Sequence, residues 1–440
     1  MKEEKFPYKF NEIFIEEEIS QYGLKASRIN KLKQWQFPVP ESVFLSGALT
    51  EKIINDGEIP LDILTFFKNE FVSLRTSPVA GAFENKIPFL YLGLNDETYK
   101  ILVKRIGVNQ AHLIYIQFLI NFAVGVFNIE AEAFKSLDKL NSGSVVKSKT
   151  LEDLGQLDIV EKYREIIGSE TGKQVPSKLS DQIRLVLIAV YKTWLSPTQK
   201  ILREVSGIPE NERLPIVLQR MVIDKGSKEW KLIRAKNFDD HTGMSKYLYF
   251  SSEDNIPYEG KNNEIPKRRS YIEATDNKKR LIVSKDLDEK TLNLIKTLSQ
   301  KVKVPFKLSL MLEGSEIFLI GYQEVSLPPK KLVEFVVSSV RSGLMEIEAG
   351  LLMIEPVTLD VFLHPSVSDS QELVSDLKGV AASPGAATGR IAMSTSKVLE
   401  YRASELEAIL VKKETIADDV KAMSLSKGIL TIKGGMTSHA

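Results

Sequence analysis

The residues with the clearest chemical signature lie near the last residue given, in the segment Gly434-Gly435-Met436-Thr437-Ser438-His439. The apolar run 429–432 precedes this segment and predicts a strand, so the glycines are expected to turn the chain from that strand toward a helix. Backbone N–H groups at such a turn attract phosphate. A lone histidine is most often an ordinary surface or core side chain. The whole motif instead predicts His439 as a phosphoryl carrier, with Gly434 and Gly435 as the glycines of a phosphate loop.

The composition excludes several other kinds of chemistry. The chain has 440 residues, no cysteine and four histidines, which excludes disulfides, thiolate catalysis and cysteine-ligated metal sites. Fifty-nine Lys and Arg against 58 Asp and Glu leave a net charge of +1, so no overall field favours a nucleic-acid partner. The absence of cysteine fits a cytoplasmic protein. The length predicts two or three domains.

One apolar stretch raises the question of a membrane span. Residues 111–129 approach the length needed to cross a bilayer, but His112, Gln117, Asn121 and Asn128 interrupt them. The first residues also lack the apolar run of a secretory signal. We therefore predict a buried core helix and no membrane association.

The order of elements predicts an α+β fold with three parts. A strand over 71–75 is followed by helices over 98–140, 150–168 and 180–204. Strands are expected over 215–223, 229–235, 246–251, 280–284, 304–312 and 316–320, and a helix over 329–350. A strand over 408–412 and a helix over 415–426 precede the histidine motif. The predicted domains are 1–325, a helical linker 326–378, and a small domain from 379 to 440.

The motifs of the chain resemble those of pyruvate, phosphate dikinases in the order in which that family has them. GILTIKGGMTSHA and GVAASPGAATGRI resemble the phosphohistidine swivelling domain of the family. Phe362-Leu-His-Pro365 resembles its linker, and Gln219-Arg-Met-Val222 resembles its nucleotide-binding domain. The nucleotide-binding domain of the family is also resembled by three further motifs: Phe71-Val-Ser-Leu-Arg75, Leu92-Gly-Leu-Asn-Asp96 and Gly23-Leu-Lys25. Nearly the whole chain is covered.

This resemblance implies a fold, an activity and site residues. Residues 1–325 are expected to form an ATP-grasp-like domain, and 379–440 part of a β/β/α phosphohistidine domain. The family uses ATP, phosphate and Mg²⁺ to phosphorylate the histidine, and a C-terminal barrel then converts pyruvate to phosphoenolpyruvate. By carry-over His439 is the phosphoryl carrier, Lys25 and Arg75 contact nucleotide phosphates, and Thr437 matches a regulatory position.

Several polar positions depart from the family pattern. The family's Mg²⁺ carboxylate falls on Ser309, and its Gln-Thr-Arg falls on Gly321-Tyr-Gln323. A family loop reads differently over 81–88, and a Gly/Ser-rich segment is reduced to 239–243. Glu313 and Glu316 are candidate replacement metal ligands, although two solvent-facing carboxylates are the simpler interpretation. No metal ligand is therefore assigned, and ATP and Mg²⁺ use are both in question.

Three hypotheses remain open. The sequence as given stops at Ala440, so we expect this polypeptide by itself not to make phosphoenolpyruvate. The first hypothesis is a dikinase segment that acts with a second chain supplying the barrel. The second is a non-catalytic binding or regulatory module, with a homodimer as one form. The third is a truncated remnant of the dikinase.

Overall fold

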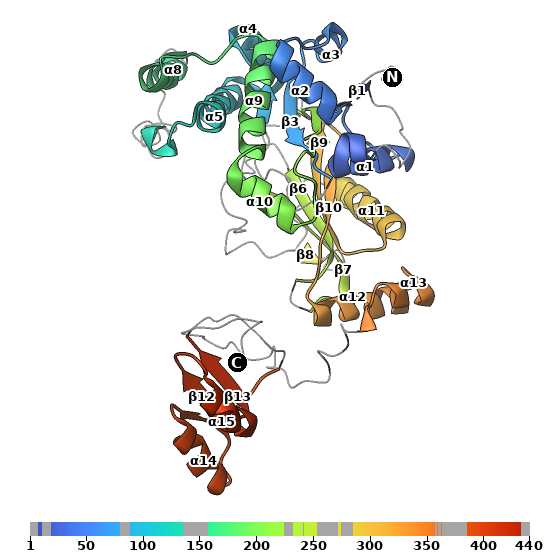
Figure 1. Ribbon diagram of the computed structural model, residues 1–440. Coiled ribbons are helices and arrows are strands. Elements are labelled where there is room, and N and C mark those ends of the chain that lie inside the picture. Colours follow the sequence, from blue (N-terminus) through green and yellow to red (C-terminus); the bar gives the residue numbers. More distant parts are fainter. Residues whose placement is uncertain are drawn as a thin grey trace, which may run out of the picture. The chain divides into compact units, whose positions relative to one another are not determined.

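The computed structural model of the protein describes residues 8–10, 19–79, 89–134, 157–223, 232–240, 242–252, 272–273, 285–356, 359, 362 and 385–432. Helices and strands alternate irregularly along these residues (Figure 1), so the chain belongs to the α+β class, as predicted. By internal contacts it divides into two compact units. The first unit comprises Met1–Asn237 and Lys246–Val325, and the second comprises Phe238–Ser245 and Ser326–Ala440.

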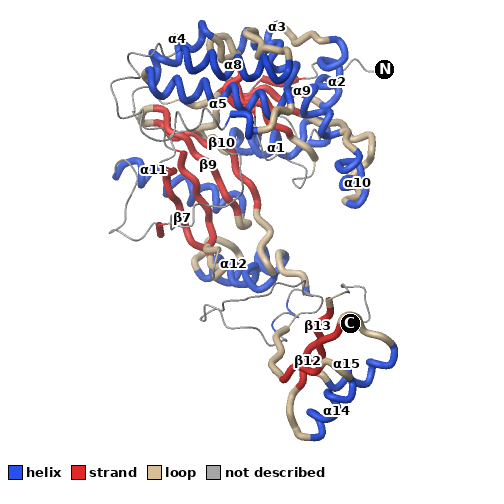
Figure 2. Tube along the Cα trace, turned by 90° about the vertical axis from the view of Figure 1, so that its left-hand side faces the viewer, coloured by secondary structure: helices blue, strands red, loops and turns tan. Residues whose placement is uncertain are grey.

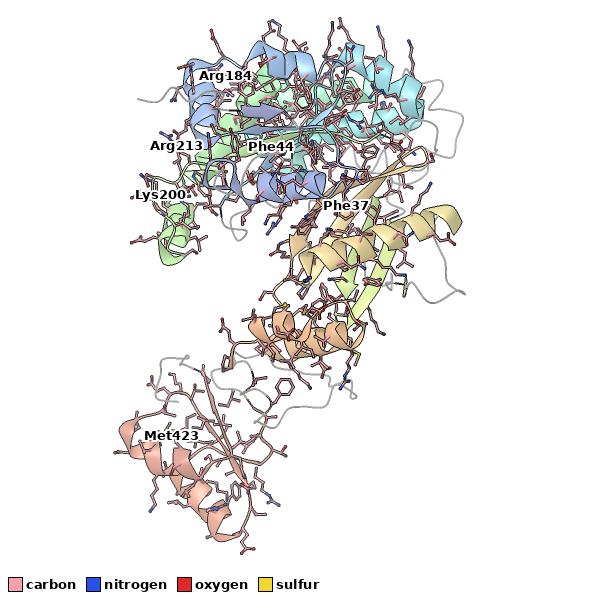
Figure 3. The ribbon with its side chains drawn as sticks, turned by 90° about the vertical axis from the view of Figure 1, so that its right-hand side faces the viewer. Phe37, Phe44, Arg184, Lys200, Arg213 and Met423 are labelled. Carbon is pink, nitrogen blue, oxygen red and sulfur yellow. The ribbon has the colours of Figure 1, made fainter. Side chains whose placement is uncertain are left out.

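Sheet A of the first unit has five strands in the order β1-β2-β5-β3-β4. These strands are β1 (Tyr8–Phe10), β2 (Ser42–Leu45), β3 (Val72–Thr76), β4 (Phe89–Leu92) and β5 (Ile216–Arg220), and all their pairings are antiparallel. Successive side chains of a strand point to opposite faces. Val43 and Leu45 accordingly join the main core, whereas Phe44 joins a separate cluster on the other face (Figure 3). Sheet A is therefore buried on both sides.

Helices cover the two faces of sheet A. Helix α1 (Ile19–Gln34) covers one face, where Tyr22, Ala26 and Ile29 pack against Phe44 and Val217. The main core on the other face receives side chains from α2 (Gly47–Asp56), α3 (Leu61–Phe66), α4 (Asp96–Ile106), α5 (Val108–Phe127), η3 (Ala131–Phe134), α8 (Leu157–Thr171) and α9 (Leu179–Trp194). Helix α10 (Pro197–Val205) follows α9.

Helix α5 is the apolar stretch that the sequence raised as a possible membrane span. Its segment Gln110–Phe127 is long and apolar enough to cross a bilayer by length and composition, and half of this segment is buried. Ile114, Phe118 and Phe122 are almost fully buried and belong to the core that covers sheet A. The burial of these side chains agrees with the predicted core helix.

Sheet B of the first unit has the strand order β10-β9-β6-β7-β8. Its strands are β6 (Leu232–Phe238), β7 (Ser245–Ser252), β8 (Ile272–Glu273), β9 (Phe306–Glu313) and β10 (Glu316–Glu324). Helix α11 (Lys285–Val302) packs on one face through Ile295 and Leu298, which join Leu308, Leu310 and Phe37 in one core (Figures 2 and 3). The opposite face carries the alternate residues of β6 and β9, which include Arg234, Lys236, Lys307 and Ser309.

The second unit contains α12 (Pro329–Arg341), α13 (Ile347–Leu352) and a three-stranded parallel sheet, sheet C. Its strands are β11 (Arg390–Ala392), β12 (Ala408–Lys412) and β13 (Gly428–Thr431), connected through α14 (Thr395–Ala403), η5 (Ala417–Asp419) and α15 (Val420–Leu425). Val398 of α14 and Ala422 of α15 pack on Leu410 of β12. Met423 lies at the edge of this small core (Figure 3).

The structure corrects the predicted boundaries at three helix breaks. The helix predicted over 329–350 is divided into α12 and α13, with Gly343 at φ +72° between them. The single helix predicted over 98–140 is divided at Gly107, whose φ of +83° ends α4 before α5 begins. The helix predicted over 180–204 is likewise two helices, because Pro197 starts α10 after an N-cap serine, Ser196. Strands β2 and β4 and helix α14 were not predicted. Residues 280–284, predicted as a strand, lie outside the described residues.

Candidate functional site

The structure describes some of the predicted site residues and not others. Lys25, Arg75 and Ser309 all lie in the first unit. His439, Thr437, Gly434 and Gly435 belong to residues 433–440, which lie outside the described part of the chain. The strand expected just before these four residues is present as β13. The family loop over 81–88 also lies outside the described residues.

Lys25 follows a close contact between α1 and the residues after β3. Gly23 has φ +79°, and a Cβ atom on it would lie 1.4 Å from the carbonyl oxygen of Ser77. The next residues are tied to the same segment, because Leu24 N donates to Pro78 O at 3.1 Å and Ala26 N donates to Ser77 Oγ at 3.0 Å. Glycine is therefore required here, and this contact places half-buried Lys25 beside the end of the strand that carries Arg75.

Arg75 connects the two sheets of the first unit. On β3 it is paired with Val217, so its side chain leaves sheet A on the face that α1 covers. Its Nη1 donates to the carbonyl oxygen of Ile320 on β10 at 3.4 Å. The same nitrogen lies 3.9 Å from the position that a Cβ of Gly321 would take. The guanidinium group of Arg75 thus lies over strand β10 of sheet B.

Strand pairing brings together the two segments where the family pattern is altered. Ser309 of β9 lies directly opposite Gly321 of β10, and Lys307 lies opposite Gln323. Tyr322, between Gly321 and Gln323, belongs to the core under α11. Ser309, Gly321 and Gln323 therefore share the face of sheet B that Arg75 approaches. The sequence resemblance had identified these positions one by one, and the structure places them side by side.

This face does not fit a bound Mg²⁺. The position that the resemblance assigns to the family's carboxylate is Ser309, whose hydroxyl offers one oxygen and no negative charge to a divalent cation. Within the described ranges, no group of three or more His, Asp or Glu side chains is arranged to hold a metal ion.

Glu313 and Glu316, the candidate replacement ligands, lie at the hairpin end of the same face. Glu313 Oε2 is 3.3 Å from Arg220 Nη1, and both side chains are less than one fifth exposed. The Nε of Arg220 also pairs with Glu41. The solvent-facing interpretation was therefore wrong for Glu313, which is half-buried in an ion pair. Glu313 lies four positions along β9 from Ser309, a distance of about 13 Å.

The side chains between these two ends are apolar. Met311 of β9 belongs to the main core of sheet A, and Phe318 and Ile320 of β10 pack against that core. The guanidinium of Arg220 lies over the ring of Phe318 at 5.6 Å from its centroid. Burial lowers the pKa of Arg220, but Glu313 and Glu41 outweigh this effect and leave the pKa raised. Arg220 therefore stays charged where the two sheets meet.

Other family motifs shape the backbone. In Leu92-Gly-Leu-Asn-Asp96, Gly93 has φ +98°, and its N–H donates to Oε1 of buried Gln182 at 2.7 Å. Asn95 then caps α4, its side chain accepting from the N–H groups of Glu97 and Thr98. The resemblance in this segment is thus explained by a turn and a helix cap.

The segment 168–173, a near match to a phosphate loop, is the end of α8, which stops at Thr171 before Gly172 with φ +66°.

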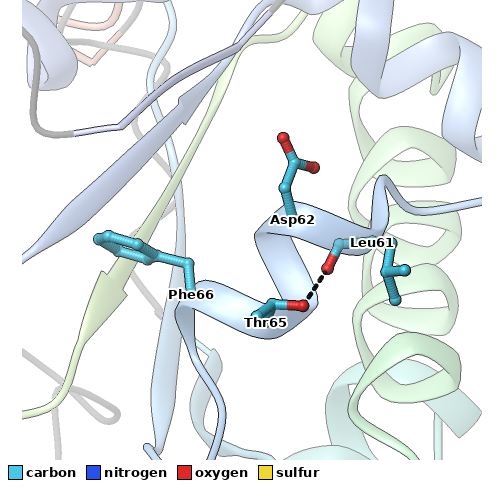
Figure 4. Close-up of a pocket in the computed structure, with 4 residues that line it drawn as sticks. All are labelled: Leu61, Asp62, Thr65 and Phe66. Carbon is cyan, nitrogen blue, oxygen red and sulfur yellow. Dashed lines mark hydrogen bonds between the residues drawn. The ribbon is translucent and has the colours of Figure 1, made fainter.

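A surface pocket beside α3 is lined by Leu61, Asp62, Thr65 and Phe66 (Figure 4). The Asp62 carboxylate accepts from Tyr8, and the Thr65 hydroxyl donates to Leu61 O at 2.8 Å. Both polar groups of the pocket already have structural partners.

Sequence reasoning missed four charged residues of the site. Arg220 was read only as part of a family motif, and Arg234, Lys236 and Lys307 were not considered. A signal was available, because Arg234 and Lys307 alternate with apolar residues along the predicted strands 229–235 and 304–312, and Lys236 continues the alternation just past the first of them. Alternation places Arg234 and Lys236 on the same face of β6, and Lys307 and Ser309 on the same face of β9.

Comparisons with known proteins agree with these motifs. The family described as PEP-utilising enzyme, mobile domain, matches residues 405–440. The chain is 27% identical over 369 residues to pyruvate, phosphate dikinase 1, chloroplastic, of Arabidopsis thaliana, which covers 80% of this chain and 36% of that protein. It is 29% identical over 359 residues to pyruvate, phosphate dikinase 1, chloroplastic, of Zea mays, covering 80% and 37%.

The chain spans a little over one third of the length of these curated relatives. The similarity extends over 80% of this chain, and the matched mobile domain includes β12, α15 and β13. The altered positions on sheet B lie within this framework. The chain is therefore a divergent relative of the pyruvate, phosphate dikinases.

Proposed function

We propose that the chain is the nucleotide-binding and phosphohistidine portion of a phosphotransferase of the pyruvate, phosphate dikinase type. In this proposal the first unit is an ATP-grasp-like domain, and sheet C begins the phosphohistidine domain. ATP would phosphorylate an imidazole nitrogen of His439, and a barrel domain would pass that phosphoryl group to pyruvate. The overall family reaction converts ATP, pyruvate and phosphate to AMP, phosphoenolpyruvate and diphosphate.

The observation that carries this proposal is the position of Arg75. Strand β3 and the hairpin of β9 and β10, which are distant from each other in sequence, bring Arg75, Ser309 and Gly321 together. A planar guanidinium beside a hydroxyl and a strand without a side chain suits the recognition of phosphate oxygens. Lys25, at the neighbouring end of α1, would add a second cation.

The direct test is phosphorylation of His439. The full chain is incubated with ATP labelled at the β- or γ-phosphate, with phosphate and Mg²⁺, and acid-labile label is sought by mass spectrometry. His439→Asn is the control, because it keeps a polar side chain and removes the acceptor nitrogen. Label on His439 that is absent from the variant supports the proposal. A folded protein without label on His439 contradicts phosphoryl transfer from ATP to this histidine. That outcome rejects catalysis by this chain whether or not a second chain supplies the barrel.

A second candidate is a nucleotide-binding or regulatory module without catalysis. Ser309 in place of the metal carboxylate and the pairing of Glu313 with Arg220 favour it. Losing a charge-stabilising group typically costs on the order of 3 kcal/mol of barrier stabilisation. ATP binding without label on His439 would distinguish this module from the transferase. Co-purification with a barrel-bearing chain, or a homodimer in light scattering, would identify its partner.

A further inference from the structure

The face of sheet B beyond Arg75 carries two cross-strand rows of polar residues. The first row is Arg234 of β6, Ser309 of β9 and Gly321 of β10, which lie directly opposite one another. The second row, two residues further along each strand, is Lys236, Lys307 and Gln323. Neighbouring strands are about 4.8 Å apart, so each row spans roughly 10 Å.

These rows collect positive charge on one side of the sheet. Arg234, Lys236 and Lys307 all point away from the core under α11, which takes the alternate residues Ile233, Ala235 and Leu308. Lys236 is 1% exposed, Arg234 is half-buried and Lys307 is exposed. Lys236 and Lys307 are direct cross-strand neighbours, so two positively charged residues lie side by side on this face.

Arg75 completes this surface from sheet A. Gly321 lacks a side chain, which leaves room over β10, and the Arg75 guanidinium lies next to this gap. The described carboxylates that β9 and β10 place on this face are Glu313 and Glu316, at its far, hairpin end. The Ser309 hydroxyl lies between Arg75 and Arg234 and can donate a hydrogen bond to an anion.

We propose that this face binds a polyphosphate anion, such as the phosphate chain of a nucleotide, in its metal-free form. The inference rests on the proposed function, because it specifies the ligand of the same site. Arg75, Arg234 and Lys307 neutralise the phosphate oxygens, a role that a divalent cation and its carboxylate ligand would otherwise share. Mg²⁺ then competes with the protein for the anion.

Calorimetry on the full chain tests this. ATP and, separately, inorganic tripolyphosphate are titrated in EDTA and in excess Mg²⁺. We expect binding in EDTA that is weakened at least threefold by Mg²⁺. Equal affinity for both anions would assign binding to the phosphate chain, and tighter binding of ATP would add a contribution from the nucleoside. No binding in EDTA, or binding only with Mg²⁺, would overturn the proposal.

Two charge reversals control for general electrostatics. Lys307→Glu changes an exposed residue of the cationic face, and we expect at least a tenfold loss of affinity in EDTA. Lys301→Glu makes the same change in charge on α11, which lies on the opposite face of sheet B, and should leave the affinity within twofold. Equal losses in both variants would contradict a defined site. Thermal unfolding verifies that each variant is folded.

This outcome is separable from that of the proposed function. Metal-free binding without label on His439 would retain the anion site and reject catalysis. Label on His439 that requires Mg²⁺, together with no binding in EDTA, would retain the transferase and reject the metal-free site.

Discussion

The guanidinium of Arg220 on β5 lies 3.3 Å from the carboxylate of Glu313 on β9, where the two sheets of the first unit meet. Glu313 is one of the two carboxylates on β9 and β10 that the sequence offered as a metal ligand. Its pairing with Arg220 gives it a structural role. The contact also fixes the hairpin end of sheet B against sheet A, while Arg75 contacts the same face further along.

Replacing Arg220 should destabilise the first unit. In Arg220→Met, Glu313 loses its partner while less than one fifth of its side chain is exposed, and we expect a loss of about 2 kcal/mol in the free energy of unfolding. Urea denaturation measures this loss. The double variant Arg220→Met, Glu313→Leu removes the unpaired charge and should recover part of it. Equal stability of Arg220→Met and the native chain would show that the pair contributes nothing.

Restoring a carboxylate to β9 should change the metal dependence of anion binding. Ser309→Glu places a negative charge in the row between Arg234 and Gly321. In EDTA this charge repels phosphate, so we expect at least a tenfold loss of affinity for tripolyphosphate, with partial recovery in Mg²⁺. Ser309→Gln, similar in size and neutral, is the matched control and should bind without Mg²⁺. The idea fails if both variants lose affinity equally in EDTA.

Gly23 should be among the least replaceable residues of the chain. Gly23→Ala would place a methyl group 1.4 Å from Ser77 O at a φ of +79°, and we expect a loss on the order of 3 kcal/mol or more. Gly172→Ala is the control, because Gly172 also has a positive φ but its Cβ would meet nothing within 4 Å. It should cost about 1 kcal/mol. Chemical denaturation compares the two, and similar losses would rule out the steric explanation.

His112 should make the protein sensitive to mild acid. Its ring is buried in α5, and neither ring nitrogen has a hydrogen-bond partner within the described residues. Burial lowers the pKa of His112 below the ordinary value of 6.5. The unfolded chain therefore takes up the proton first as the pH falls. Stability is fully present above about pH 6.5 and is lost below it, by about 1.4 kcal/mol for each unit of pKa difference.

The variant His112→Leu removes this titration. Its free energy of unfolding should fall less between pH 7.5 and pH 5 than that of the native chain, and at pH 7.5 it should be at least as stable, because two unpaired nitrogens are removed. Fluorescence-monitored urea unfolding at both values measures the difference. An identical pH dependence in the two proteins would exclude His112 as the cause.

Much of the fold was predictable because the hydrophobic pattern is local. The predicted strands over 71–75, 304–312 and 408–412 correspond to β3, β9 and β12 within one or two residues. The breaks at Gly107 and Pro197 carried ordinary glycine and proline signals that the long apolar periodicity outweighed. Strands β2 and β4 are only four residues each and wholly buried, so they show no alternation.

The site was less predictable because it depends on pairing between distant segments. The resemblance marked Ser309 and Gly321 separately, but their register across β9 and β10 comes from the hairpin. The pairing of Arg220 with Glu313 joins residues 93 positions apart, and no local pattern encodes it. The predicted roles of His439 and Thr437 remain predictions.

The contact from Arg75 to Ile320 O means that one bound anion would contact both sheets of the first unit. Arg75 belongs to a strand of sheet A, whereas Arg234 and Lys307 belong to strands of sheet B. An anion that contacts cations of both sheets links the two sheets. Separating the sheets then also requires breaking the ionic contacts between the anion and these side chains. Amide hydrogens of β9 and β10 would then exchange more slowly when the anion is present, by the factor that the bound ligand contributes to stability.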